Sequence, residues 1–385
     1  MRARKFSALY GAIAFLVVSV AGFLTGCASG HKQFVYVAGQ GTNEVFEFSV
    51  QSNGALLPLG SPNFPAGSNP AAVAPHKSGD FLYIADFAGN DVTLLDINAS
   101  NGNLSVPVST SIVVSVNPPN IFAAGGGPIS LQMSPTAPFL FVANQTSGNV
   151  TSYAVDPGTG SLGLIGTTPV VQAPPPPAPT PVTNPNSIAI SPKGDFLFVA
   201  NPPQGTIAVL SISDKGVLNY AAGSPFSMGA GATPTTVAVE HSGRFLYVTD
   251  TAHNAVLGFS IQSGGALTPI NGSPFAAGAA PTGLGIDPQG ALLFAANSGS
   301  NSVSAYAIDS TSGALGAVTG SPFATDGVGP SAVAVDAETS FVYVTEQTSH
   351  DIAAFSIASN GALKAVTGSP FGVATSASAI SVVRR

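Results

Sequence analysis

A four-residue segment of aromatic and aliphatic residues recurs seven times, and this repetition limits the fold more than any other feature of the sequence. The seven copies are Phe34–Val37, Phe81–Ile84, Phe139–Val142, Phe196–Val199, Phe245–Val248, Leu292–Ala295 and Phe341–Val344. Each copy is rich in the aromatic and β-branched residues that favour β-strands. A polar turn and an alternating strand follow each copy, and a Gly-x-Leu turn then opens a further strand. The chain is therefore built from repeated groups of short strands.

The spacing of the copies predicts how these strands are arranged. Successive copies begin 47 to 58 residues apart, and four strands in such a period are typical of a β-propeller blade. Six lead strands precede the second to seventh copies, whereas the seventh, residues 379–383, lies at the C-terminus. We therefore predict an all-β, seven-bladed propeller of four-stranded antiparallel blades over residues 34–385. The C-terminal strand would complete the N-terminal blade and leave no open edge.

The first 26 residues are typical of a targeting segment. Arg2, Arg4 and Lys5 are followed by a mostly apolar stretch over 12–24, which suits a signal peptide better than a membrane span. The stretch ends in Leu24-Thr25-Gly26-Cys27, which resembles a bacterial lipobox. That resemblance implies cleavage before Cys27, lipidation of its thiol and a short tether over 27–33. The alternative is an ordinary secretory signal with an incidental cysteine.

The residue after the cysteine bears on location. Ala28 stands where enterobacterial lipoproteins retained at the inner membrane carry Asp. We therefore expect a lipid-anchored protein of the bacterial cell envelope, at the outer membrane. The sequence leaves open whether it faces the periplasm or the exterior.

Composition excludes several classes of function. The chain has 11 Lys and Arg against 18 Asp and Glu, so it lacks the basic surface of a nucleic-acid-binding protein. Its single cysteine excludes an internal disulfide and a cysteine-based metal cluster. Charged residues make up only 8% of the chain, about a third of the usual share. We expect a monomer that binds no nucleic acid.

The repeats resemble a known family. Motifs such as Ser191–Asn201 and Gly272–Phe275 are similar to those of the lactonase family of seven-bladed propellers, whose named member is a 6-phosphogluconolactonase, and to surface propellers with YVTN repeats. The resemblance implies that the turns between second and third strands share one face, here called the top face, with the loops between blades. The remaining turns lie on the bottom face. These motifs specify the blade and leave the chemistry open.

The first strand of each blade would line the central channel. One alternating set is small or polar, and the other is aliphatic and suited to packing between blades. The first set is Ala72/Ala74, Ser130/Gln132, Ser187/Ala189, Thr236/Ala238, Gly283/Gly285, Ala332/Ala334 and Ala379/Ser381; the second is Val73, Leu131, Ile188, Val237, Leu284, Val333 and Ile380. The pattern does not settle which set faces the axis, but neither carries a charge. The channel walls therefore offer no general acid or base.

Polar residues recur at the top end of the second strands. They are Asp86, Asn144, Asn201, Asp250, Asn297 and Glu346, with Gly39 in the first blade. One interpretation is turn chemistry, because Asn and Asp bond to the following backbone. The other is a binding rim that includes Asp91 and Asp351, on which Asp250, His253, Glu346 and His350 act as catalytic groups.

The bottom face carries a candidate metal site. Glu240, Asp287 and Asp336 occupy equivalent positions on three consecutive blades, where they could hold Ca²⁺. The alternative is that each carboxylate caps its own turn, as Ser134 and Ser191 would at the same place on other blades. No other cofactor is indicated.

Two inter-blade loops on the top face are longer than the others. They contain Phe122 in the first and Pro175 and Pro177 in the second, and they could form a lip that binds a partner. By contrast, most cations of the mature chain fall in bottom-face turns or at the chain ends, near the expected lipid anchor. The top-face turns carry no Lys or Arg to bind a phosphorylated substrate.

These features favour a non-catalytic, lipid-anchored propeller that presents its top face to an envelope protein or glycan. The family resemblance supports an alternative, a lactone hydrolase acting on a sugar lactone in the periplasm. A calcium-stabilised scaffold is the third hypothesis.

Overall fold

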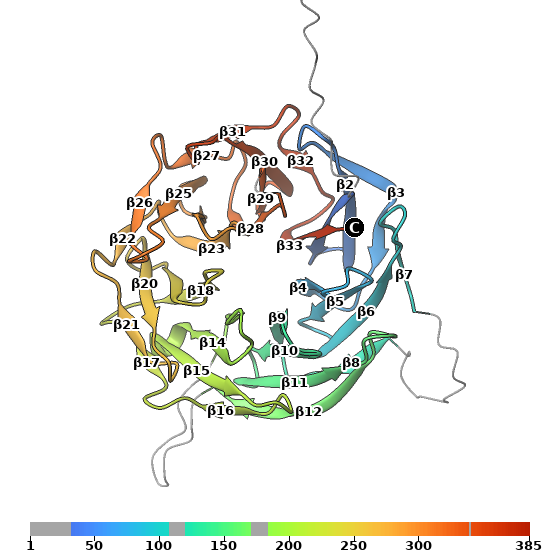
Figure 1. Cartoon of the computed structure of the whole chain (residues 1–385). Helices are drawn as coiled ribbons and strands as arrows, with labels where there is room; N and C mark the ends of the chain where they lie inside the picture. Colours follow the sequence, from blue (N-terminus) through green and yellow to red (C-terminus); the bar gives the residue numbers. More distant parts are fainter. Residues whose placement is uncertain (1–31, 108–119, 171–183, 339) are drawn as a thin grey trace, which may run out of the picture. The chain divides into compact units, whose positions relative to one another are not determined.

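The computed structural model describes residues 32–107, 120–170, 184–338 and 340–385. Within them, the strands form seven antiparallel sheets arranged as blades around one axis (Figure 1). The structure confirms the predicted all-β, seven-bladed propeller. No helix in these ranges is long and apolar enough to cross a membrane.

The blades are numbered here in chain order, with their strands given from the axis outward. Blade 1 comprises β33 (Ala377–Arg384), β1 (Gln33–Gly39), β2 (Glu44–Val50) and β3 (Leu56–Pro65), and blade 2 comprises β4 (Pro70–Pro75), β5 (Phe81–Asp86), β6 (Asp91–Ile97), β7 (Leu104–Ser105) and β8 (Ile121–Ala123). Blade 3 comprises β9 (Pro128–Met133), β10 (Phe139–Asn144), β11 (Asn149–Val155) and β12 (Leu162–Pro169), and blade 4 comprises β13 (Ser187–Ile190), β14 (Phe196–Asn201), β15 (Thr206–Ile212), β16 (Leu218–Tyr220) and β17 (Phe226–Ser227).

The last three blades repeat the pattern of blade 4. Blade 5 comprises β18 (Pro234–Val239), β19 (Phe245–Asp250), β20 (Ala255–Ile261), β21 (Leu267–Pro269) and β22 (Phe275–Ala276). Blade 6 comprises β23 (Pro281–Ile286), β24 (Leu292–Asn297), β25 (Ser302–Ile308), β26 (Leu315–Ala317) and β27 (Phe323–Ala324). Blade 7 comprises β28 (Pro330–Val335), β29 (Phe341–Glu346), β30 (Asp351–Ile357), β31 (Leu363–Ala365) and β32 (Phe371–Gly372). A short 3-10 helix, Pro202–Gln204, follows β14.

The C-terminal strand closes the ring, as predicted. β33 pairs with β1 along its length, from Gln33 opposite Arg384 to Gly39 opposite Ala377. Lys32 and Arg385 extend this ladder with two backbone hydrogen bonds of 2.9 and 2.8 Å. The Arg385 guanidinium also reaches blade 2, where it lies 2.6 Å from the Asp80 carboxylate. The two ends of the described chain therefore hold one blade together and join it to the next.

The outermost strand is split in two in five of the blades, and both pieces pair with the third strand. In blades 4 to 7 a Ser-Pro step separates the pieces, and the serine hydroxyl accepts a hydrogen bond from a third-strand amide, as Ser273 does from Gly258 at 3.0 Å. This contact explains the Gly-Ser-Pro-Phe motif as part of the blade. The motif is therefore structural in these four blades.

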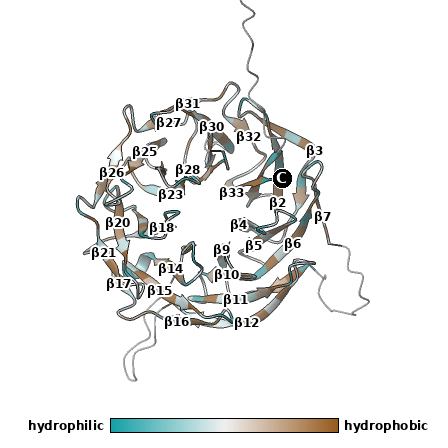
Figure 2. Ribbon diagram, in the orientation of Figure 1, coloured by the Kyte–Doolittle hydropathy of each residue, from teal (hydrophilic) through white to brown (hydrophobic). Residues whose placement is uncertain are grey.

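The hydrophobic core lies between the blades. Seven clusters of buried residues each combine side chains from two neighbouring blades, and Figure 2 shows hydrophobic and hydrophilic residues alternating along the strands that supply them. The aliphatic set of the first strands belongs to these clusters: Leu131 and Ile188, for example, are each 6% exposed. Burial of this set between blades is what turns the small set toward the axis.

The Gly-x-Leu turns also join blades. Gly102 has a φ of +78°, and a Cβ there would lie 2.3 Å from the Phe34 ring of the preceding blade. The carbonyl oxygen of Gly102 accepts a 2.6 Å hydrogen bond from the buried Tyr36 hydroxyl. Only glycine combines this left-handed conformation with so close a contact, which explains its recurrence.

Candidate functional site: a neutral axial cavity

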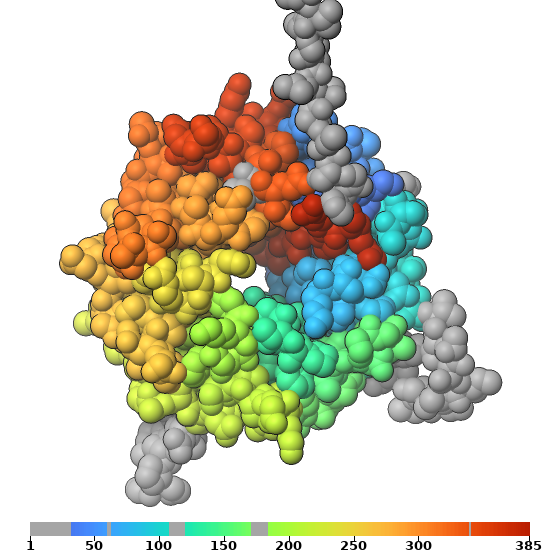
Figure 3. Space-filling model, in the orientation of Figure 1, coloured from blue at the N-terminus to red at the C-terminus, as the bar shows by residue number. Residues whose placement is uncertain are grey.

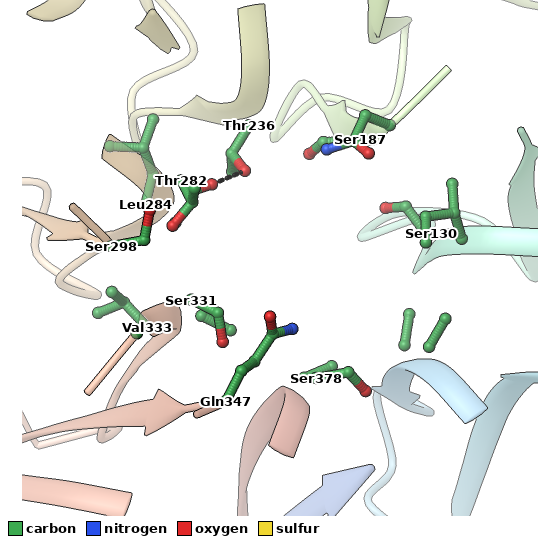
Figure 4. Close-up of a pocket in the computed structure, with 18 of the residues that line it drawn as sticks. Ser130, Ser187, Thr236, Thr282, Leu284, Ser298, Ser331, Val333, Gln347 and Ser378 are labelled. Atoms are coloured by element: carbon green, nitrogen blue, oxygen red, sulfur yellow. Dashed lines mark hydrogen bonds between the residues drawn. The ribbon is translucent and has the colours of Figure 1, made fainter. Parts of the chain in front are cut away.

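A cavity of about 550 Å³ opens at the top of the central channel. Figure 3 shows the central opening in the space-filling view, and Figure 4 shows the side chains that surround it. The first strands of the blades form its wall, and Gln40, Ser298 and Gln347, which follow second strands, stand at its mouth. Gln347 points into the middle of the space (Figure 4).

The small set of first-strand residues faces this cavity. Ala72, Ser130, Ser187, Thr236, Gly283, Ala332 and Ala379 all contribute to its lining. The sequence left open which alternating set would do so, and the structure resolves the point because the aliphatic set is needed in the inter-blade clusters. Leu284 and Val333 nevertheless reach the wall as well.

Sequence reasoning missed a second layer of polar side chains. Thr282, Ser331 and Ser378 line the cavity, although strict alternation would turn them away from the axis. Each lies at a register shift between the first and second strands, such as that between Pro330 and Ala332. The extra residue of a β-bulge changes the direction of its side chain. No sequence signal in a single chain marks these bulges clearly.

These bulged hydroxyls donate hydrogen bonds to the next blade. Ser378 donates to the Pro70 carbonyl at 3.0 Å, and Thr282 donates to the Pro330 carbonyl at 3.1 Å. Ser331 lies 3.3 Å from the Ala377 carbonyl, with the Thr345 hydroxyl 2.9 Å away. The protons of these hydroxyls are thus used inside the protein, while oxygen lone pairs remain toward the cavity.

The serines on the other side of the cavity are bonded in the opposite sense. The Ser130 hydroxyl accepts from the Ile188 amide, and the Ser187 hydroxyl accepts from the Val237 amide, both at 3.3 Å. Neither hydroxyl donates to another group in the described part of the chain. Their protons therefore remain available to a molecule in the cavity.

The cavity carries no charge of its own. The described residues that line it are hydroxyl, amide and apolar residues, without a single ionisable side chain. General acid–base catalysis and phosphate binding both use ionisable groups or a nest of backbone amides. This lining offers hydrogen bonds to a neutral polar molecule instead.

The polar ring at the ends of the second strands is buried and does not form an exposed rim. Asp86, Asn144, Asn201, Asp250, Asn297 and Glu346 are each at most 1% exposed. The loop from the preceding blade packs on several of them: a Cβ on Gly67 would lie 2.3 Å from Asp86, and one on Gly327 would lie 1.9 Å from Glu346. These groups hold the inter-blade loops, a role that the turn interpretation did not include; Asp250 also accepts from the following Ala252 amide, as that interpretation expects.

Two of the four candidate catalytic residues, Asp250 and His253, lie in contact. His253 Nδ1 lies 2.6 Å from Asp250 Oδ2; the histidine side chain is 51% exposed, whereas the aspartate side chain is buried. The other Asp250 oxygen accepts hydrogen bonds from the Thr233 and Ala252 amides, at 2.9 and 3.2 Å. A buried carboxylate thus orients an exposed imidazole on the top face. Neither residue lines the axial cavity.

The other two candidate catalytic residues, Glu346 and His350, are not joined in this way. His350 has a φ of +59° and occupies the turn position at which Asn43, Asn90, Asn254 and Asn301 also have positive φ values. Burial raises the pKa of Glu346, and the neighbouring Asp351 carboxylate contributes further. No side-chain hydrogen bond joins Glu346 to His350, or this pair to Asp250 and His253, among the described residues.

The proposed metal ligands do not converge. The Asp287 carboxylate accepts from the Ala291 and Leu292 amides at 2.7 Å, and Asp336 accepts from Ser340 and Phe341. Glu240 accepts from the amide and hydroxyl of Ser242. The described part of the chain contains no group of three or more His, Cys, Asp or Glu that could hold a metal ion. Each carboxylate caps its own turn, so the expected shared calcium site is not formed by these residues.

The remaining predicted residues are placed as follows. Phe122 lies in β8, opposite Val92, and its half-buried ring packs against the cluster between blades 2 and 3. It therefore belongs to the blade and not to an exposed lip. Cys27, Pro175 and Pro177 lie outside the described residues, so their predicted roles stay predictions.

Comparison with known proteins agrees with this fold. The periplasmic gluconolactonase of Pseudomonas aeruginosa is 20% identical with a TM-score of 0.76, over 92% of this chain and 99% of that one. A putative 6-phosphogluconolactonase from Bacteroides fragilis is 18% identical with a TM-score of 0.75, over 91% and 98%. One from Bacteroides uniformis is 16% identical with a TM-score of 0.75, over 91% and 99%. No curated protein matches the sequence.

The sequence itself matches a family description over most of its length. Residues 27–117, 119–176 and 220–328 match the family described as "Lactonase, 7-bladed beta-propeller". This match covers β1 to β12, resumes at the end of β16 in blade 4 and ends after β27 of blade 6, and the closed ring of seven sheets agrees with it. The chain therefore belongs to the lactonase family of seven-bladed β-propellers.

Proposed function

We propose that this protein is a non-catalytic binding propeller whose axial cavity takes a neutral, polyhydroxylated ligand of the sugar class. The observation that carries the proposal is the lining of the cavity, which combines hydroxyl and amide groups with no ionisable side chain among the described residues. Sugar hydroxyls both donate and accept hydrogen bonds, and such a lining can satisfy them without the cost of burying a charge.

The size of the cavity supports the same class of ligand. A volume of about 550 Å³ lies within the range of about 300–1,000 Å³ that is usual for small-molecule sites. A phosphorylated sugar would need a cation or a nest of amides for its phosphate group. Because the described lining has neither an Arg nor a Lys, we expect it to favour neutral sugars over phosphorylated ones.

Ligand-observed NMR with the mature domain from Ala28 tests this proposal. The panel contains glucose, 1,5-anhydro-D-glucitol, D-glucono-1,5-lactone and their 6-phosphate counterparts where these exist. We expect saturation transfer to at least one neutral ring and none to the phosphorylated forms. Preferential binding of the phosphorylated sugars, or binding of no sugar, would contradict the proposal.

Hydrolysis of a neutral sugar lactone is the second candidate function. The Asp250–His253 pair is the observation in its favour, because Asp250 fixes the Nδ1 side of an exposed imidazole that could accept a proton from water through Nε2. The name of the Pseudomonas relative, a periplasmic gluconolactonase, points to the same substrate class. Attack of that water on the lactone carbonyl would open the ring to a hydroxy acid.

A pH-stat assay of lactone opening separates the two functions. The non-catalytic proposal expects the rate with protein to equal the spontaneous rate. Catalysed turnover that is lost in His253→Ala, but kept in His350→Ala, would establish the hydrolase and assign its base. The His350 variant is the matched control because both histidines are exposed in equivalent top-face turns.

We further propose that Cys27 carries a lipid and anchors the propeller in the cell envelope. The Leu24–Cys27 motif supports this, and the described chain begins at Lys32, beside Arg385 on the bottom face. Mass spectrometry of the protein purified from a bacterial membrane tests it: an acylated N-terminal Cys27 is expected, and an unmodified thiol would refute it.

A further inference from the structure

We propose that the axial cavity binds its ligand in one orientation, with an acceptor-only oxygen toward Ser130 and Ser187 and with ligand hydroxyls toward Thr282, Ser331 and Ser378. This inference rests on the proposed sugar-binding function and adds the polarity of the site. It makes the two serines of blades 3 and 4 the residues that determine specificity for a carbonyl group.

The donor side of the cavity is set by its bonds to the next blade. The hydroxyls of Ser130 and Ser187 each accept an amide hydrogen from the neighbouring first strand, from Ile188 and Val237 respectively. An amide can only donate, so these bonds consume a lone pair and leave the hydroxyl proton free. Both side chains line the cavity. They therefore present two donors to the ligand.

The acceptor side is set in the same way, with the direction reversed. Thr282, Ser331 and Ser378 have carbonyl oxygens of the next blade within 3.0–3.3 Å. A carbonyl can only accept, so the hydroxyl proton is used and lone pairs remain. Thr236 of blade 5 follows this second pattern and donates to the Thr282 carbonyl. The change of direction thus falls between blades 4 and 5.

The two sides face each other across the axis. Ser130 and Ser187 belong to blades 3 and 4, whereas Thr282, Ser331 and Ser378 belong to blades 6, 7 and 1. Figure 4 shows Ser187 across the open space from Ser331, with Gln347 reaching between the sides. A ring with a carbonyl at one end and hydroxyls at the other matches this arrangement. A ring with a CH₂ in place of the carbonyl would leave both serine donors without an acceptor.

A pair of ligands that differ only in the carbonyl tests this inference. D-glucono-1,5-lactone has a C=O where 1,5-anhydro-D-glucitol has a CH₂, and both rings are neutral. Dissociation constants are measured by saturation-transfer NMR within minutes of dissolving the lactone, with gluconate as the control for its hydrolysis. We expect the lactone to bind about tenfold more tightly than the anhydroglucitol, since one or two added hydrogen bonds have that effect.

Substitutions of Ser130 and Ser187 test whether these two donors cause the preference for the lactone. The Ser130→Ala, Ser187→Ala double variant should bind both rings equally, and Ser130→Thr, Ser187→Thr, which keeps both hydroxyls, should retain the preference. Ser331→Ala should weaken binding of both rings by a similar factor and leave their ratio unchanged. Comparing two ligands in two proteins forms a thermodynamic cycle. The cycle separates the loss of the carbonyl contact from a general weakening of the site.

The outcomes separate this inference from the proposed function. Equal binding of the two rings by the unmodified protein would overturn the orientation and leave sugar binding intact. Binding of neither ring would overturn both. A lactone preference that survives in the alanine double variant would refute the role of the two serines. If that variant does not fold, the ratio in the unmodified and threonine proteins still decides the orientation.

Discussion

The Ser378 hydroxyl donates a 3.0 Å hydrogen bond to the carbonyl oxygen of Pro70, so the strand that closes the ring is also joined sideways to blade 2. Similar bonds pass from blade to blade around the axis through Thr282 and Ser331. Blades 2 and 3 are exceptions, because Ala71 and Ile129 occupy their bulged positions and have no hydroxyl to offer the next blade. The same bonds that join the blades thus fix which atoms the cavity presents.

This relationship predicts opposite effects of two matched substitutions. Ser378→Ala should lower the free energy of unfolding by about 1 kcal/mol, the usual net value of a neutral hydrogen bond. Ala71→Ser should add the inter-blade hydrogen bond that blade 2 lacks and should not lower the free energy of unfolding. Urea denaturation monitored by circular dichroism measures both. Equal destabilisation by the two changes would show that the inter-blade hydroxyl contributes nothing.

The buried carboxyl of Asp86 predicts a stability that depends on pH. Burial raises the pKa of Asp86 to about 7. The Thr93 hydroxyl, which donates a 2.6 Å hydrogen bond to the carboxylate, partly offsets this rise. A native pKa above the unfolded value means that the fold favours the protonated acid. Its ionisation therefore costs stability progressively as pH rises from about 4 to about 7. Asp86→Asn should stabilise the protein at pH 8.5 by the order of 2 kcal/mol and change it little at pH 4.

The converse change provides the control. Asn144 occupies the equivalent buried position in blade 3, where its amide donates to Asn149 and Thr151 at 2.8 Å. Asn144→Asp should create the same loss of stability with rising pH that Asp86→Asn removes. Urea midpoints from pH 4 to 9 test both variants. Parallel pH profiles for the wild-type protein and Asp86→Asn would contradict the interpretation.

The predicted catalytic residue Asp250 should prove to be structural. Asp250→Ala leaves the Thr233 and Ala252 amides without their acceptor and should cost about 1–3 kcal/mol of stability. Asp250→Asn keeps an acceptor oxygen, and Asn occupies this position in blades 3, 4 and 6. The asparagine variant should therefore lose less stability than the alanine variant. Thermal unfolding measures the difference. An alanine variant as stable as the asparagine variant would show that Asp250 does not hold the loop.

Calcium should leave the stability unchanged. Glu240, Asp287 and Asp336 are each bonded to their own turns, and a ligand that does not bind the native state does not stabilise it. Addition of 5 mM CaCl₂ after EDTA treatment should therefore shift Tm by less than about 1 °C. A saturable rise in Tm would revive the calcium-stabilised scaffold, and its loss in Asp287→Asn would place the ion.

Most of the fold could be predicted because it repeats. Seven copies of one strand segment fix the number of blades, and the unpaired strand over 379–383 fixes the closure. The Gly-x-Leu turns could be identified as turns. Their packing against the preceding blade, as between Gly102 and Phe34, could not be predicted because no repeat reveals contacts between neighbours.

The site was less accessible to sequence reasoning. Thr282, Ser331 and Ser378 reach the axis through bulges, and the polarity of Ser130 depends on the register between blades 3 and 4. Acidic residues at equivalent positions suggested a rim and a metal site. In the structure, the carboxylates of Asp250 and Asp287 accept hydrogen bonds from backbone amides instead of binding a shared ligand. The structure places the His253 ring against the Asp250 carboxylate, and the chemical role of both residues stays a prediction.

Blocking the cavity tests the binding account most directly. In the mature domain with Cys27 removed, Gln347→Cys gives a single thiol at the cavity mouth, and Ser359→Cys gives one in an exposed turn of the same blade as a control. Each variant is titrated with the neutral ring that binds best, before and after labelling with a bulky maleimide. We predict that labelling at residue 347 abolishes binding and that labelling at residue 359 leaves it unchanged. Binding that persists with the label at residue 347 would contradict the axial cavity as the ligand site.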